Sequence, residues 1–348
     1  MTQSADVLLK QGMSQYQTGE FEAALQSWHE ALSLYRASQN LRREGAALGN
    51  LGAAYQAMSD LSEAIACYQQ HLAIAQQIQD LSGEVNALTN LSNTYQALGE
   101  YTKAIAYLQQ RLAIAQTVEN RQSEGQILGS LRSAYTAVED FLHANECQQQ
   151  QLVILRELLL STASDDFNTS LKMLGLNPTE DLAGANLSQI DLCHADLRDA
   201  NLDRANLKQA DLTFANLSRA KLSQACLAHA RLGNANLRDA DLSSADLSHA
   251  DLRTILPRAN LSGANLSSAN LSSAYLVGVN LNGANLTGAI LREADLSKVN
   301  LTSANLQDAD FTRAELNEAK VENARFSHVL GLSEQMKHQL QQGGAIFE

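Results

Sequence analysis

The stretch ANLSGANLSSANLSSAYL, residues 259–276, places a leucine at every fifth position. An α-helix advances about 100° per residue, so a step of five residues would scatter these leucines around its surface. In a β-strand an odd step would send successive leucines to opposite faces. A regular period of five therefore requires a backbone that turns between the leucines, so that all of them can point the same way.

The period of five extends far beyond this stretch. Centres recur from Leu182 to Leu252 and again from Leu256 to Phe326, which gives 30 five-residue units, 27 of them centred on leucine. Alanine lies two residues before the centre in 25 units, and positions two apart in an extended segment share a face. The residue between them, usually Asn or Asp, then points outward and can hydrogen-bond the adjacent turn. Each unit forms one edge and one corner, and four units close a coil of twenty residues.

This pattern resembles the pentapeptide-repeat family, whose motif A(D/N)Lxx is written here as ADLRDANLDRANLKQADL over residues 195–212. The resemblance implies a right-handed, four-sided parallel β-helix over residues 181–328. Because the ends of a solenoid leave unpaired strand edges, we expect helical caps. We place one within 164–178, in a linker and capping segment 161–180. The other lies within 332–342, with Ser333 as N-cap, in a C-terminal helix and tail over 329–348.

The period slips once. The step between Leu252 and Leu256 is four, and Pro257 follows, which predicts a kink or an irregular corner at residues 253–258. Residues twenty apart stack on one face, so Ile255 should lie under Tyr275 and Pro257 under Val277. These outward positions would form a small exposed apolar patch, a candidate contact site. The alternative is local filling around the kink, with Ile255 folded inward.

The first half of the chain repeats with a longer period. The segment ALGNLGAAYQAMSDLSEAIACYQQHLAIAQQIQD (47–80) recurs forty residues later as ALTNLSNTYQALGEYTKAIAYLQQRLAIAQTVEN (87–120). Apolar residues fall at helical spacing, and Ser59-Asp60 and Gly99-Glu100 separate the two helices of each unit. One such hairpin cannot bury its apolar faces alone, so we expect stacked hairpins.

Residues 1–160 resemble the tetratricopeptide repeat (TPR) family. The matching residues of one unit are Leu51, Gly52, Tyr55 and Ala64, and those of the next are Leu91, Tyr95 and Ala104. The forty-residue unit is similar to the variant found in spindle-orientation adaptors and kinesin light chains. The resemblance implies an all-α superhelix, with Met13 at the glycine position of the first unit.

The resemblance also implies a ligand site, because TPR arrays hold extended or helical peptides on the face made by each first helix. The groove positions that it assigns are Lys10, Gln11, Asn50, Asn90, Asn93 and Gln96. Carboxamides there offer a peptide backbone both a donor and an acceptor. The alternative is that these amides satisfy neighbouring helix ends. With a single lysine, the groove does not reproduce the paired basic clamp for a C-terminal carboxylate.

Composition limits the classes of function. The net charge is −13; residues 1–160 hold 9 Lys+Arg against 16 Asp+Glu, and residues 181–328 hold 14 against 17. Without a basic stripe, we expect no nucleic-acid binding. No stretch of 18 apolar residues indicates a membrane span, and the first residues lack the basic and apolar regions of a secretory signal. The four cysteines follow no metal-ligand spacing. We therefore expect a cytoplasmic protein without a metal site.

The sequence also lacks the features of an enzyme. It has no phosphate loop, no GxSxG and no HExxH, and a leucine-packed interior leaves no cavity for a cofactor. We predict a non-enzymatic adaptor or scaffold whose TPR groove binds a protein or peptide partner, with the β-solenoid as a spacer or second docking surface. The combination is similar to scaffold proteins common in cyanobacteria. The sequence does not indicate an oligomeric state.

A second reading is a DNA mimic, because some pentapeptide-repeat proteins interact with gyrase by imitating duplex DNA with an acidic rod. This chain interleaves Arg198, Arg219, Arg231 and Arg238 with its carboxylates. The run Asp241, Asp246, Asp251 goes around the coil rather than along it. Both features favour the adaptor.

Overall fold

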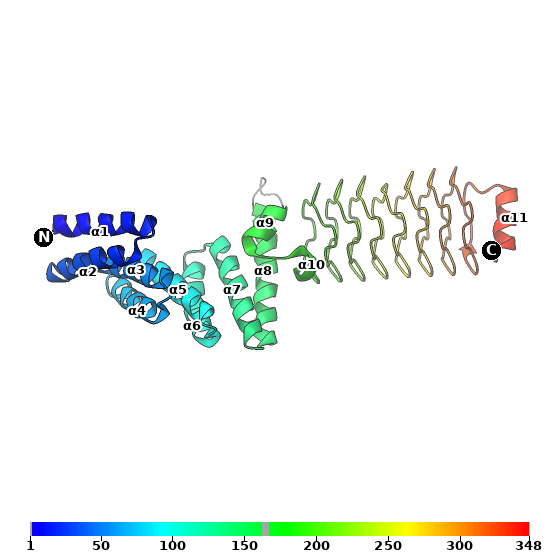
Figure 1. Cartoon of the computed structure of the whole chain (residues 1–348). Helices are drawn as coiled ribbons and strands as arrows, with labels where there is room; N and C mark the ends of the chain where they lie inside the picture. The colour runs from blue at the N-terminus through cyan, green and yellow to red at the C-terminus, as the bar shows by residue number, and fades with distance from the viewer. Residues whose placement is uncertain (1, 162–166, 348) are drawn as a thin grey trace. The chain divides into compact units, whose positions relative to one another are not determined.

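Helices follow one another at a spacing of twenty residues in the first part of the chain. The computed structural model describes residues 2–161 and 167–347, and the chain divides into two compact units after Gln148. In the first unit each helix packs on the next, and the seven that lie wholly within it stack in chain order (Figure 1). These helices are α1 (Thr2–Gln17), α2 (Phe21–Ala37), α3 (Leu41–Ala57), α4 (Leu61–Gln77), α5 (Leu81–Ala97), α6 (Tyr101–Thr117) and α7 (Arg121–Ala137).

The loops between these helices repeat one conformation. A left-handed residue, with φ between 51° and 81°, recurs every twenty positions, at Gly19, Gln39, Ser59, Gln79, Gly99, Glu119 and Glu139. At five of these seven loops an Asn or Asp side chain then caps the next helix by accepting a hydrogen bond from the backbone N–H three residues on. These capping residues are Asn40, Asp60, Asp80, Asn120 and Asp140.

The first repeat follows the others more closely than the sequence suggests. A Cβ atom on Gly12 would come within 2.4 Å of the Trp28 ring, and one on Gly52 within 2.5 Å of the Tyr68 ring. Gly12 therefore occupies the glycine position, and the assignment of Met13 to it is wrong by one residue. Met13 is 48% exposed instead. The error arises because Tyr16 lies 39 residues before Tyr55, one short of the period.

Successive hairpins are joined by polar contacts at equivalent positions. The residue before the end of each second helix donates to a glutamate eight residues on, in the first turn of the next hairpin. The pairs are Arg36–Glu44, Gln76–Glu84 and Gln116–Glu124, at 2.8, 2.9 and 3.2 Å. These contacts fix the register of one repeat on the next, over the buried leucines and alanines between them.

The second unit begins inside helix α8 (Phe141–Ser161), which contributes residues to both units. The Gln151 amide donates to the carbonyl of Leu174 at 2.7 Å, and the Arg156 guanidinium to the carbonyl of Ser188 at 2.6 Å. Helix α9 (Phe167–Leu174) ends before Gly175, where φ is +67°, and α10 (Pro178–Asp181) follows. Residues 164–166 of the first predicted capping segment lie outside the described residues.

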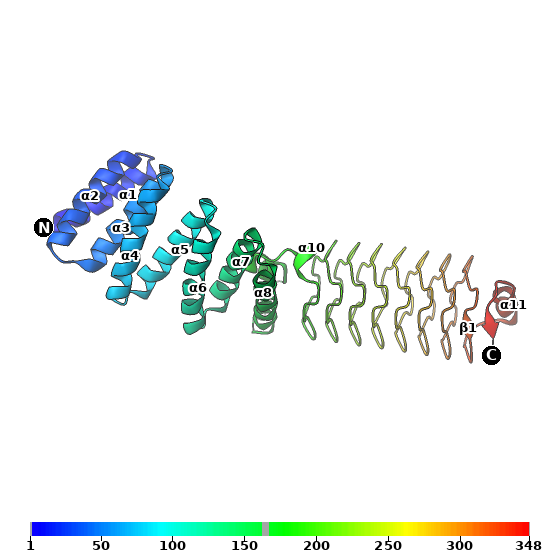
Figure 2. The ribbon, with the colours of Figure 1, turned by 90° about the horizontal axis from the view of Figure 1, so that it is seen from below.

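A four-sided parallel solenoid follows, as predicted. Parallel bridges join residues twenty apart in four columns, for example from Asn206 to Cys226 and on to Asp246, so the coils stack in register (Figure 2). The inward leucines and alanines are buried, except Leu316 and Ala319 near the C-terminal end, which are partly exposed. The predicted turn contact is also present, since outward Asn and Asp side chains such as Asn300 accept from the backbone N–H two residues on.

The slip in the period is absorbed at one corner. Around it the bridges span 19 residues, from Asn236 to Ile255, and return to 20 between Ile255 and Tyr275, so the columns continue on both sides. Thr254 takes the place of the usual alanine; it is buried and its hydroxyl donates to the carbonyl of Ala235. The irregularity is therefore a shortened corner within one coil.

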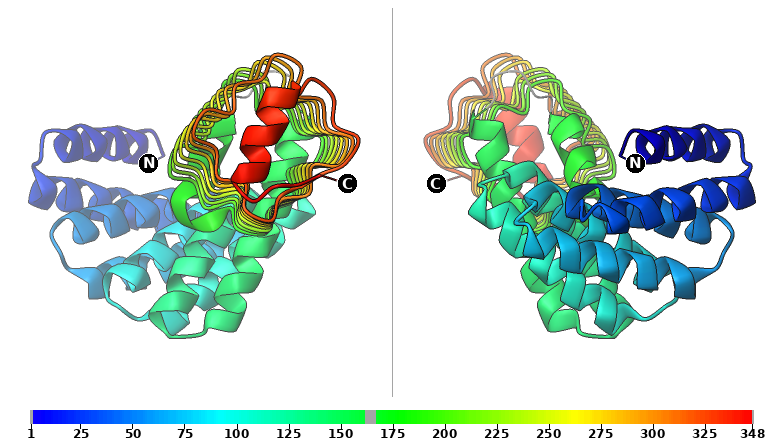
Figure 3. Two further views of the ribbon diagram at one scale, coloured as in Figure 1. Left: turned by 90° about the vertical axis from the view of Figure 1, so that its right-hand side faces the viewer. Right: turned by 90° about the vertical axis from the view of Figure 1, so that its left-hand side faces the viewer.

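A helix and a returning strand complete the last coil. Helix α11 (Glu334–Gln342) starts at Ser333, whose hydroxyl accepts from the backbone N–H of Met336 at 3.2 Å. Seen along the solenoid, this helix lies across the end of the last coil (Figure 3). Strand β2 (Ile346–Phe347) then pairs in parallel with β1 (Arg325–Phe326) and adds a rung to one column. Within residues 2–161 and 167–347 no helix combines the length and hydropathy that a membrane crossing requires.

Candidate functional site

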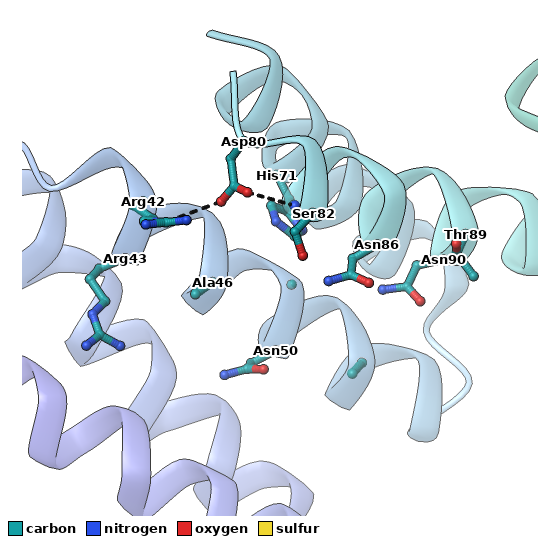
Figure 4. A pocket seen from close by; sticks show the side chains of 13 residues that line it. Arg42, Arg43, Ala46, Asn50, His71, Asp80, Ser82, Asn86, Thr89 and Asn90 are labelled. Carbon is teal, nitrogen blue, oxygen red and sulfur yellow. Dashed lines mark hydrogen bonds and ion pairs between the residues drawn. The ribbon is translucent and has the colours of Figure 1, made fainter. Parts of the chain in front are cut away.

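A groove of about 720 Å³ lies between α3 and α5, the first helices of two successive repeats (Figure 4). One wall comes from α3 and the other from α5, with His71 of α4 and Asp80 of the connecting loop between them. The lining residues are Arg42, Arg43, Ala46, Gly49, Asn50, Ala53, His71, Asp80, Ser82, Gly83, Asn86, Thr89 and Asn90. The helical period explains this set, because Arg42, Ala46 and Asn50 are four residues apart on one stripe of α3.

Three amide side chains dominate the middle of the groove. Asn50 of α3 lines one side of it, and Asn86 and Asn90 of α5 line the other (Figure 4). No hydrogen bond engages these three carboxamides within the described part of the chain. An unengaged carboxamide keeps two N–H donors and an acceptor oxygen available to a ligand.

The floor of the groove is made of small residues and one imidazole. The His71 ring lies against Gly45 and Gly49 of α3, where a Cβ atom would meet it at 3.1 Å. Its Nδ1 atom is buried and has no hydrogen-bond partner among the residues that the structure describes. Burial lowers the pKa of His71, opposed in part by the negative charge of Asp80. The imidazole is therefore neutral at neutral pH and forms an uncharged part of the floor.

Charged groups gather at one end of the groove. Asp80 caps α5 by accepting from the Gly83 N–H at 3.2 Å, and its other oxygen lies 3.4 Å from Nε of Arg42. The Gly83 hydrogen bond, with the Arg42 charge, lowers the pKa of Asp80 below its usual value, so this carboxylate stays ionised. Arg43 lies 3.5 Å from Asp6, on α1, and both arginine side chains are largely exposed.

The structure brings together only part of the predicted groove set. Asn50 and Asn90 line the groove. Asn93 lies one turn beyond Asn90 on α5 and is exposed, outside the lining. Gln96 occupies the repeat position of Gln56, whose oxygen accepts from the Tyr68 hydroxyl of the paired helix, so that position faces away from the groove.

Lys10 and Gln11 of α1 are both exposed and outside this groove. Gln11 holds the position that Leu51 and Leu91 fill with buried side chains in the next repeats. The sequence reasoning also missed Arg42, Arg43, His71 and Asn86. Arg42 lies eight residues before Asn50 on α3, and Asn86 lies four residues before Asn90 on α5. The helical period would therefore have identified these two residues.

The predicted apolar patch on the solenoid is only partly exposed. Ile255 and Tyr275 stack in one column, with 46% and 45% of their surface exposed, so Ile255 is not folded inward. Val277 is half-buried. Pro257 is buried in the shortened corner, which corrects its predicted outward position.

Arginines pair with seven of the 17 carboxylates of residues 181–328. Arg219 clamps Asp199 of the preceding coil with two hydrogen bonds of 2.7 and 2.6 Å, and Arg258 does the same with Asp239. Such forks lower the pKa of each carboxylate, mainly through the hydrogen bond from the arginine. His229 and His249, one coil apart, stack with ring centroids at 4.7 Å.

Comparisons with known proteins agree with this division. A tetratricopeptide repeat model matches residues 3–77 and 43–117, and a model of pentapeptide repeats (8 copies) matches 181–213, 215–253, 254–292 and 294–330. No curated protein matches the chain.

Solved structures add similar proteins for each half. HetL, a pentapeptide repeat protein involved in heterocyst differentiation regulation from Nostoc sp. strain PCC 7120, is 39% identical; the match covers 41% of this chain and 70% of HetL, with a TM-score of 0.22. Rfr23 from Cyanothece 51142 is 38% identical, over 27% of this chain and 62% of Rfr23, with a TM-score of 0.21. A putative kinesin light chain from Podospora anserina is 18% identical, over 50% and 95%, with a TM-score of 0.38.

Proposed function

Because the chain belongs to the pentapeptide repeat proteins and carries tetratricopeptide repeats ahead of them, we propose that it is a non-enzymatic adaptor that binds a peptide segment of a partner protein. The groove between α3 and α5 is the proposed peptide site. The observation that carries this proposal is the set of three unengaged carboxamides that line the groove, Asn50 from α3 and Asn86 and Asn90 from α5.

An extended peptide matches this arrangement chemically. Its backbone presents N–H and C=O groups at short intervals, and asparagine can pair with both. The small residues Ala46, Gly49 and Ala53 leave room for a backbone to approach α3 closely. The amides would then provide affinity for any peptide backbone, with selectivity left to the ends of the groove.

The solenoid is proposed as a spacer or second docking surface. Ile255 and Tyr275, stacked in one column, offer exposed apolar surface to a partner. Val277 is half-buried and Pro257 is buried, so they add little to this surface. The carboxylates of the solenoid weigh against the alternative of DNA mimicry. Mimicry needs dense uncompensated negative charge, whereas residues 181–328 hold 14 Lys+Arg against 17 Asp+Glu, and seven arginines form ion pairs with carboxylates.

Capture from a native lysate tests the adaptor role. The full chain serves as bait beside an Asn50→Ala/Asn90→Ala variant, with captured proteins identified by mass spectrometry. The control is Asn282→Ala, an exposed asparagine of the solenoid. We expect a partner that the wild type and the control retain and the double variant loses. A partner held equally by all three would place binding elsewhere, and capture of a topoisomerase would favour mimicry.

A further inference from the structure

The groove is positively charged within a negatively charged half of the chain. Its lining holds two cations, Arg42 and Arg43, and one anion, Asp80. Residues 1–160 as a whole hold 9 Lys+Arg against 16 Asp+Glu. The two arginines are adjacent in the first turn of α3, so their charge is concentrated at one end of the groove (Figure 4).

The ion pairs of these arginines leave most of their donors unused. The Nε atom of Arg42 lies 3.4 Å from Asp80, and the Nε atom of Arg43 lies 3.5 Å from Asp6. Arg219 of the solenoid, by contrast, engages Asp199 with two nitrogens at 2.6–2.7 Å. A guanidinium has five N–H donors in a planar fork that suits a carboxylate. Both groove arginines can therefore accept a further anionic partner.

Asp80 cannot take both cations. Its Oδ1 atom accepts from the Gly83 N–H as the N-cap of α5, which leaves one oxygen for Arg42. Moving this carboxylate toward Arg43 would uncap α5. The remaining positive charge at this end of the groove therefore has no partner within the groove lining.

We infer that the groove selects peptides with an acidic side chain, whose carboxylate binds the Arg42 and Arg43 guanidinium groups while Asn50 and Asn90 hold the peptide backbone. This inference rests on the proposed peptide site. Arg42 precedes Asn50 by eight residues, a distance of about 12 Å along the helix. An extended peptide rises about 3.3 Å per residue, so the acidic side chain should lie about four residues from the backbone held at Asn50.

Selection from a phage-displayed random peptide library, with the intact chain as bait, tests this inference. We expect peptides enriched in Glu or Asp at one fixed position. The selected peptides are then synthesised with amidated C-termini, so that only side chains carry the carboxylate, and binding is measured by fluorescence anisotropy. Replacing the acidic residue by Gln should weaken binding about five- to tenfold, because exposed charge pairs contribute modestly.

Variants of the protein, combined with the two peptides, test whether the acidic side chain binds the two arginines. Arg42→Gln/Arg43→Gln should weaken binding of the acidic peptide by a similar factor and leave the Gln peptide unaffected. The matched control is Arg36→Gln, which removes a positive charge outside the groove and places there the residue found at the equivalent Gln76 and Gln116. It should change neither affinity.

Each contrary result has a distinct meaning. Peptides selected without acidic enrichment, but lost with Asn50→Ala/Asn90→Ala, would overturn this inference and leave the proposed peptide site standing. Failure to select any peptide would overturn both. A phosphoserine at the acidic position that binds more than about tenfold tighter than Glu would overturn the carboxylate assignment in favour of a phosphorylated partner.

Discussion

Gly52 sets how closely the two helices of its hairpin approach, because the Tyr68 ring fills the space where a side chain would begin. The Gly52→Ala variant should lose about 2 kcal/mol of unfolding free energy through overpacking, measured by urea denaturation. The equivalent position of the next repeat holds Ser92 opposite Leu108, so a Cβ is tolerated where no ring faces it.

This pairing of glycine with an aromatic ring predicts a rescue. In a Tyr68→Leu background the ring is absent, and Gly52→Ala should then cost much less than in the wild type. Equal costs in the two backgrounds would show that the glycine is required for another reason.

His71 makes the first unit sensitive to acid. Burial lowers its pKa in the folded state below the value in the unfolded chain, so the unfolded state binds more protons as the pH falls. The stability contribution is complete above the unfolded pKa of about 6.5 and is lost as the pH falls toward the folded value. Helical melting temperatures should therefore decrease between about pH 7.5 and about pH 5.5, and less in His71→Gln.

Asp80 and Asp140 do not obscure this measurement. Backbone hydrogen bonds are the main cause of their lowered pKa values. The stability that these two carboxylates contribute is therefore lost only at more acidic pH. An identical pH profile for wild type and His71→Gln over this window would contradict the assignment to His71.

At the scale of the element, the shortened corner of the solenoid depends on Thr254. The carbonyl of Ala235 accepts from the Ile255 N–H at 3.3 Å, longer than the 2.9 Å that is usual at this ladder position, and Thr254 donates a second hydrogen bond to it. Thr254→Val keeps the shape and leaves this buried carbonyl poorly satisfied. We expect a loss of about 1 to 2 kcal/mol in urea unfolding of the solenoid.

Thr302→Val is the matched control, because the Thr302 hydroxyl bonds only the side chain of Asn300 on a surface turn. It should cost less than about 0.5 kcal/mol. If the two variants were equally stable, the hydroxyl of Thr254 would have no part in accommodating the slip.

At the scale of the whole molecule, periodicity made most of the architecture predictable. A period of five with inward leucines permits few backbones, and every coil of the solenoid repeats the same pattern. The corner at residues 253–258 was harder to predict, because the spacing of the leucines does not say whether Pro257 is buried or points outward. Burial of Pro257 follows from how the corner packs, which the pattern does not encode.

The site was less predictable than the fold. Asn50 and Asn90 follow from the repeat, but His71 enters the groove from the second helix of its hairpin, where Ala31 and Arg111 hold the equivalent positions. The spacing of sixteen residues from Gly52 to Tyr68 would have identified Gly12 with Trp28 in the first repeat. The position of His71 gives no such spacing, because its residue changes from repeat to repeat and its contacts depend on the neighbouring helix.

The most direct test of the peptide groove is site-specific photo-crosslinking in the full chain. A photoreactive phenylalanine analogue at Ala46, which lines the groove, is compared with the same residue at Ser62, exposed on α4 outside it. Irradiation with the partner should give a crosslinked peptide from Ala46 and none from Ser62. Crosslinks from Ser62 alone would contradict the central claim that the partner lies between α3 and α5.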